Sequence, residues 1–202
     1  MLMKKLSLAV VAVATLTAHT FASAQAYTGA TIGRSDQSLG CSFATTCDTK
    51  SNNFKVFGGY NIDKNFSVEL AYFSLGSANY SYPASISPYG NVAAPGAMFN
   101  SKVKQSGVSL AAIYKLEFNE TFGGFAKLGI ANVKEEQSFS VPGIAIGDSS
   151  FRSNKALFGV GLTYKLSPDW TLRAEAEKLN PGTFSGKGRA ATNFNIGAQY
   201  NF

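Results

Sequence analysis

The chain has 202 residues and a formal net charge of +6. Only 15% of its residues are charged, compared with about a quarter in soluble domains, and 13% are aromatic. The 18 basic residues form no long cluster, which argues against a nucleic-acid-binding protein. This composition favours β-structure and leaves few charges for contact with water.

The N-terminus has the layout of a secretory signal peptide. A lysine pair precedes an uncharged stretch at 6–16, and small residues follow it up to Ala26. The uncharged stretch is too short to span a bilayer as a helix, which needs about 20 residues. We therefore expect a signal peptide at 1–26, with cleavage after Ala26 or after Ala24, and a single domain at 27–202.

The first polar segment of the predicted domain contains both cysteines. A weakly alternating stretch at 27–34 is predicted as the first strand, and Cys41 and Cys47 follow it in a polar loop at 35–53. Export sends these thiols to an oxidising compartment, so a local disulfide between them is expected. Two isolated cysteine ligands without a histidine in the domain make a poor metal site, and no metal or cofactor is expected.

Seven further segments alternate between apolar and polar residues, which is the period of a β-strand with one apolar face. The last is the clearest, because its even positions from Thr192 to Phe202 are mostly apolar and its odd positions are asparagine, glycine or glutamine. The even positions of the other segments carry Phe54, Val56 and Tyr60; Phe66, Val68, Leu70 and Tyr72; Val108, Leu110 and Tyr114; Phe122, Leu128 and Ile130; Phe158, Val160, Leu162 and Tyr164; and Trp170 and Leu172.

The two faces of these segments predict a membrane protein. The apolar face is continuous and bulky, while the odd-numbered face mixes glycines, hydroxyls and charges in amounts that suit a narrow interior. This pattern is typical of transmembrane barrels, whose apolar side chains face lipid. Beyond the signal peptide there is no apolar run of the roughly 18 residues that a transmembrane helix needs. The sequence therefore predicts an all-β fold, an eight-stranded antiparallel up-and-down transmembrane β-barrel.

The predicted connections alternate in length. Three are short turns, at 63–65, 117–121 and 167–169, and four are long loops, at 35–53, 76–101, 134–151 and 179–191. In outer-membrane barrels the short turns face the periplasm and the long loops face outward, so both termini are expected in the periplasm. Aromatic residues beside the short turns are expected to form the periplasmic girdle. They are Tyr60, Phe66, Tyr114, Phe122, Tyr164, Trp170, Tyr200 and Phe202.

These segments resemble the OmpA-like family of small outer-membrane barrels. The resemblance covers the whole predicted domain and rests on YTGATIGRS at 27–35, GGYNIDKNFSVELAYFSLG at 58–76, FGVGLTYKLSPDWTLRAEAE at 158–177 and YNF at 200–202. It implies the outer membrane of a Gram-negative bacterium. It also implies that the terminal aromatics Tyr200 and Phe202 form the signal that the barrel-assembly machinery reads.

The resemblance extends to the interior of the barrel. Glu69 and Arg173 match one charged pair that plugs the lumen of OmpA-like barrels, whereas a second family pair falls on Ile113 and Thr163 here. One plug is therefore missing, and the family's closed or gated lumen carries over only in part.

The residues themselves also predict contact between Glu69 and Arg173. Both are odd-numbered, and each lies four positions beyond a short turn, so they should stand at similar heights in the lumen. Lys127 and Glu175 share that face and are expected to extend the pair into a network.

Six basic residues lie at or near the predicted outer ends of strands, where they are expected to meet lipopolysaccharide phosphates. They are Lys102, Lys104, Arg152, Lys178, Lys187 and Arg189. The alternative is a scatter of solvated charges.

Two functions fit the sequence. The first is a structural or surface-interaction barrel, whose outer loops contact lipopolysaccharide, host molecules or other cells. Because eight strands leave an interior just wide enough for side chains, bulk diffusion is not expected. The alternative is a small channel or transporter for ions or hydrophobic solutes. An enzyme is not expected, because the one histidine, His19, lies in the signal peptide and rules out a serine–histidine–carboxylate triad. A monomer in outer-membrane lipid is expected.

Overall fold

The computed structural model describes residues 25–38, 41, 44–83, 98–141, 144–181 and 188–202. The predicted signal peptide lies outside this part of the chain except for Gln25 and Ala26, and Lys187 lies outside it too. No helix within the described residues is long and apolar enough to cross a membrane. The strands are β1 (Ala26–Gln37), β2 (Thr46–Asp48), β3 (Lys50–Asn61), β4 (Phe66–Pro83), β5 (Met98–Glu117), β6 (Phe122–Val141), β7 (Ile144–Lys165), β8 (Trp170–Asn180) and β9 (Ala191–Asn201).

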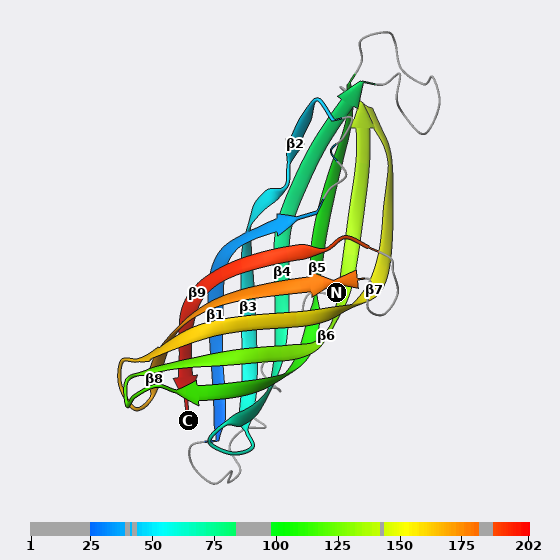
Figure 1. Cartoon of the computed structure of the whole chain (residues 1–202). Coiled ribbons are helices and arrows are strands. Elements are labelled where there is room, and N and C mark those ends of the chain that lie inside the picture. The colour runs from blue at the N-terminus through cyan, green and yellow to red at the C-terminus, as the bar shows by residue number, and fades with distance from the viewer. Residues whose placement is uncertain (1–24, 39–40, 42–43, 84–97, 142–143, 182–187) are drawn as a thin grey trace, which may run out of the picture.

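Eight of these strands close into a barrel (Figure 1). Each long strand pairs antiparallel with its neighbours in the chain, and β1 pairs with β9, which completes the ring. The short β2 pairs with β4 alone and is an addition to one rim. The predicted eight-stranded antiparallel barrel is confirmed.

The two faces of the wall differ as the alternation predicts. Along β4, Leu70 is 61% exposed, whereas its neighbour Glu69 is 2% exposed. The exposed apolar rows continue around the barrel through Ile32, Val160 and Ile196. Hydrocarbon can surround such a wall without loss of backbone hydrogen bonds, because the closed ring pairs its strands internally.

Aromatic rings gather on the outer face beside the short turns. Three cross-strand ring pairs have centroid distances of 4.8 to 5.2 Å: Phe66 with Tyr114, Phe122 with Tyr164, and Trp170 with Tyr200. The ring of Phe202 packs against Tyr200 at 5.1 Å. The expected girdle is thus present as a band of rings at the short-turn end.

The strands extend well into ranges that the sequence predicted as loops. The strand β4 continues to Pro83 and β5 begins at Met98, while β6 continues to Val141 and β7 begins at Ile144. The loop boundaries at 76–101 and 134–151 are therefore corrected. Beyond the membrane the outward face meets water and becomes polar, so the apolar alternation ends although the backbone pairing continues. The resulting β4–β5 and β6–β7 hairpins project beyond the other strands (Figure 1).

Where this extension begins, a β-bulge in β4 changes which residues of the strand face inward. The register with β5 shifts between Ser74 and Ser77, so that β4 has one extra residue there. Gly76, inside the bulge, has a φ of 71°, a left-handed conformation that favours glycine. Beyond the bulge the even-numbered Ala78 is fully buried, whereas below it even positions face outward.

The structure contains the expected disulfide between Cys41 and Cys47, whose Cα atoms are 6.1 Å apart. Cys47 belongs to β2 and lies opposite Tyr80 of β4. The disulfide therefore fastens the β1–β3 connection beside the extended part of β4, outside the ring that forms the membrane wall.

We predict that the double variant Cys41→Ser, Cys47→Ser still forms the barrel. So short a disulfide loop contributes only about 2 kcal/mol in the chain-entropy model, and the variant leaves every strand pairing of the ring in place. The unheated variant should still migrate differently from the boiled sample on a denaturing gel, while a protease cuts the β1–β3 connection faster than in the parent protein. Loss of the heat-dependent mobility difference would contradict this assignment.

Candidate functional site

Six charged side chains meet in the middle of the lumen. Each is at most 6% exposed, and each occupies an odd position of its strand, as the inward face requires. They are Lys55 on β3, Glu69 on β4, Lys127 on β6, and Arg173, Glu175 and Glu177 on β8. We call this set the lumen network. Its three cations and three carboxylates cancel in formal charge.

Glu69 is held from two sides. The Nη1 of Arg173 donates to its Oε2 at 2.7 Å, and the Nζ of Lys127 donates to its Oε1 at 2.7 Å. The hydroxyl of Tyr27 also donates to Oε2 at 3.4 Å. The structure thus brings together Glu69 and Arg173, and Glu175 joins them through the Nη2 of Arg173 at 3.0 Å.

Arg173 lies between two aromatic rings. Its guanidinium carbon is 4.6 Å from the ring centroid of Phe57 and 4.3 Å from that of Phe125. Such contacts stabilise a desolvated guanidinium by about 2 kcal/mol or more. Sequence reasoning gave these rings no role. The available signal was their odd numbering, which places two large aromatic side chains on the inward face.

Lys55 and Glu177 complete the network, although the sequence analysis did not include them in it. Lys55 contacts Glu175 and donates to Glu177 at 2.8 Å, and Lys127 donates to Glu177 at 2.6 Å. Parity alone placed these residues in the lumen, but their mutual contacts depend on three different strands. Because every cation here meets two or more carboxylates, the large cost of burying six charges is offset inside the network.

A second layer of inward-facing side chains lies on the side of the lumen network away from the short turns. Eight buried apolar side chains from β4 to β9 form one cluster there: Phe73, Leu75, Ala111, Ala131, Val133, Leu157, Leu179 and Ala191. On β4 this layer follows Glu69 by four positions, and on β8 it follows Glu175 by four. A solute that crossed the barrel would have to pass the lumen network and then this apolar layer.

The end of the lumen away from the short turns contains a third group of contacts, which corrects the placement of Arg189. The sequence placed this residue toward lipopolysaccharide, but its guanidinium binds Glu135 of β6, which is 1% exposed. The backbone nitrogen of Arg189 donates to the same carboxylate at 3.3 Å, and Lys155 donates to the Arg189 carbonyl. A buried carboxylate needs cationic partners, and that need turns Arg189 inward.

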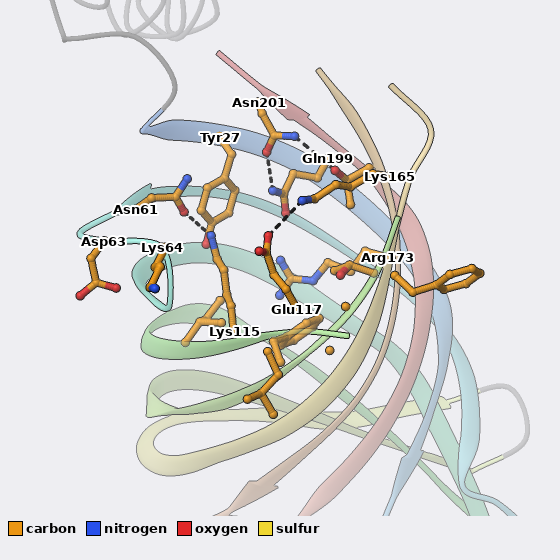
Figure 2. A pocket seen from close by; sticks show the side chains of 18 of the residues that line it. Tyr27, Asn61, Asp63, Lys64, Lys115, Glu117, Lys165, Arg173, Gln199 and Asn201 are labelled. Carbon is orange, nitrogen blue, oxygen red and sulfur yellow. Dashed lines mark hydrogen bonds and ion pairs between the residues drawn. The ribbon is translucent and has the colours of Figure 1, made fainter. Parts of the chain in front are cut away.

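At the short-turn end the lumen opens into a cavity of about 560 Å³. Figure 2 shows Tyr27, Lys115 and Arg173 among the side chains that line it. Lys115 donates to Asn61, and in the same view Lys165 pairs with Glu117 at 3.0 Å. The lumen network can therefore be approached from this end as far as Arg173.

The outward face of the extended hairpins is basic. Lys102 and Lys104 on β5 and Arg152 on β7 are exposed there. Between these strands Lys134 pairs with Glu136 at 2.5 Å, and the ammonium group lowers the pKa of the Glu136 carboxyl. We call Lys102, Lys104 and Arg152 the basic face. Lys178, the remaining described member of the predicted set, is exposed at the outer end of β8.

The inward side of the same hairpins is packed with aromatic rings. Tyr82 stacks with Tyr80 at 6.1 Å and with Phe99 at 5.1 Å, and Phe99 meets Phe139 at 5.8 Å. Gln137 donates to the Tyr80 hydroxyl at 2.7 Å. The extended strands therefore have a small core of their own, which holds the basic face in a defined arrangement.

Comparison with known proteins matches this architecture. The family model of the OmpA-like transmembrane domain matches residues 21–200. Neisserial surface protein A is similar in structure, with a TM-score of 0.58 and 17% identity over 90% of this chain and all of that one. The attachment invasion locus protein Ail of Yersinia pestis gives 0.54 and 14% over the same shares. Ail in complex with the heparin analogue sucrose octasulfate gives 0.51 and 15% over 88% and 99%. No curated protein matches the sequence.

We predict that Glu69→Gln and Arg173→Met each lower the free energy of unfolding by about 3 to 5 kcal/mol, because each removes an ion pair and leaves the buried network with one uncompensated charge. The double variant should recover about 1 to 3 kcal/mol of the summed loss, measured by urea unfolding in lipid vesicles. The matched control is the exposed pair Glu117 and Lys165, whose Glu117→Gln, Lys165→Met cycle should give a coupling below about 1 kcal/mol. Simple additivity at Glu69 and Arg173 would show that the two charges are not coupled.

Proposed function

The chain belongs to the OmpA-like transmembrane domain family, and on this premise we propose that it acts at the bacterial cell surface by binding polyanionic partners through its extended hairpins. The proposal also places the barrel in the outer membrane as a monomer surrounded by lipopolysaccharide, with both termini in the periplasm. We also propose that the barrel-assembly machinery recognises the terminal residues Tyr200 and Phe202.

The proposal rests on the basic face, whose three residues are held in place by the extended hairpins. Within the described chain none of Lys102, Lys104 and Arg152 has a carboxylate within 4.0 Å, although Lys104 lies opposite Glu136 and Arg152 donates to Asn132, so most of their charge faces solvent. Long-strand pairing and the aromatic core beneath them hold these groups in place, which reduces the entropy lost on binding. Phosphate and sulfate groups are the chemical match for such an array.

The structure of Ail with a heparin analogue illustrates one kind of partner that a barrel of this fold takes. At 15% identity that likeness concerns the fold, so the choice of a sulfated or phosphorylated partner here rests on the basic face of this chain. Lipopolysaccharide phosphates and sulfated host polysaccharides share the required chemistry.

The interior supports surface interaction over the alternative of a channel. The lumen network and the apolar layer place buried side chains in the lumen at two successive heights, which supports a lumen without an open path. Conductance in planar bilayers separates the two functions, because a surface-interaction barrel closed by both layers should give no steady ion current, even in the Glu69→Gln variant. A steady current would favour the channel.

We predict that Lys102→Gln, Lys104→Gln weakens binding of the purified barrel to immobilised heparin by about tenfold, which corresponds to about 1.4 kcal/mol for two exposed contacts. Parent binding should also fall steeply as the salt concentration rises, because exposed charges are screened. The control Lys64→Gln, Lys165→Gln removes the same charge at the short-turn end and should leave binding unchanged. Equal losses in both variants would mean that heparin responds to net charge and would refute the proposal.

A further inference from the structure

The outer wall has a hollow at a different place from the basic face. It measures about 940 Å³ and lies across β7, β8, β9 and β1. Bulky exposed side chains form its sides, and two alanines of β8 form its floor. The sides are Val160, Leu162, Phe194, Ile196 and Ile32, and the floor is Ala174 and Ala176.

The small residues of β8 explain why this part of the wall is hollow. Ala174 lies in register between Leu162 of β7 and Ile196 of β9, and Ala176 has equally bulky neighbours on both strands. Large side chains of β7 and β9 therefore flank the two alanines of β8, and the space above the alanines is the hollow. The hollow is predominantly apolar, and its volume lies near the upper end of the range of about 300 to 1,000 Å³ that ligand pockets occupy.

Basic side chains mark the end of the hollow that points away from the short turns. Arg34 and Lys50 line it, and Lys178 follows Ala176 on the outward face of β8. None of the three forms an ion pair within the described residues. Of the carboxylates that line the hollow, Glu175 is engaged in the lumen network, which leaves Asp36 as the counter-charge.

We propose that this hollow binds an anionic, phosphate-bearing lipid, with an acyl chain over Ala174 and Ala176 and the phosphate between Arg34 and Lys178. The two parts of the hollow match the two parts of such a molecule. The apolar floor lies among the lipid-facing rows, and the basic end lies where those rows stop, at the depth of the headgroups. A planar guanidinium such as that of Arg34 suits a phosphate with two parallel hydrogen bonds.

Charge also decides between this lipid and a second copy of the chain. In a two-fold contact the same patch faces itself, so the basic residues at the end of the hollow would come close to their own copies. That arrangement is repulsive for Arg34 and Lys178, whereas a phosphate neutralises them. The inference goes beyond the proposed function, since it concerns the wall and needs nothing from the extended hairpins.

The test is native mass spectrometry of the mature chain, refolded in detergent and incubated with lipid A that has two phosphates or with the same lipid after removal of both. The parent protein should retain the phosphorylated form about tenfold better, the effect of about one charge-assisted contact. The variant Arg34→Gln, Lys178→Gln should lose this preference. The variant Ala174→Leu, Ala176→Leu should retain both forms less well, because the added side chains fill the floor.

The matched control is Lys64→Gln, Lys165→Gln, which removes two basic residues at the short-turn end, away from both the hollow and the basic face, and should retain lipid A as the parent does. Equal retention of both lipids by the parent, or an unchanged preference in the Arg34 and Lys178 variant, would overturn the proposal. A dimer that disappears in the alanine variant would assign the hollow to a second copy instead. If the alanine variant fails to show the folded mobility on a gel, the Arg34 and Lys178 variant still decides.

Discussion

A strand that crosses hydrocarbon has no water to satisfy its peptide groups, and the other features of this molecule follow from that constraint. The pairing of β1 with β9 meets it by leaving no open edge. Closure in turn forces alternate side chains into a space cut off from solvent, where a lone charge is costly. Lys55, Lys127 and Arg173 can lie there because three carboxylates accompany them.

Much of the barrel could be predicted because lipid contact leaves a periodic trace in the sequence. The rows through Leu70 and Val160 mark the wall, and equal distances from the short turns brought Glu69 and Arg173 together. The extended ends of β4 to β7 lack this outward apolar row, since their outward face is polar and their rings, such as Phe99, pack on the inward side. The contact of Arg189 with Glu135 joins residues 54 apart in sequence, and no local pattern encodes it.

Because side chains fill the lumen in layers, the groups that can bind a ligand lie mainly on the outside of the barrel. The charged side chains of the lumen network pair with one another, and two rings flank Arg173. On the outer surface, by contrast, Lys102, Lys104, Arg34 and Lys178 have no carboxylate within 4.0 Å among the described residues. The two surfaces proposed to bind ligands, one on the hairpins and one on the wall, are therefore separate from each other and from the lumen.

The bulge at Gly76 determines which mutations the part of β4 beyond it can tolerate during evolution. One extra residue there turns Tyr80 and Tyr82 toward the packed side of the hairpins. A point substitution farther along the strand alters one side chain, whereas a single deletion at the bulge would exchange the two faces of everything beyond it. Descendants of this gene should therefore vary in the composition of this segment far more readily than in its length.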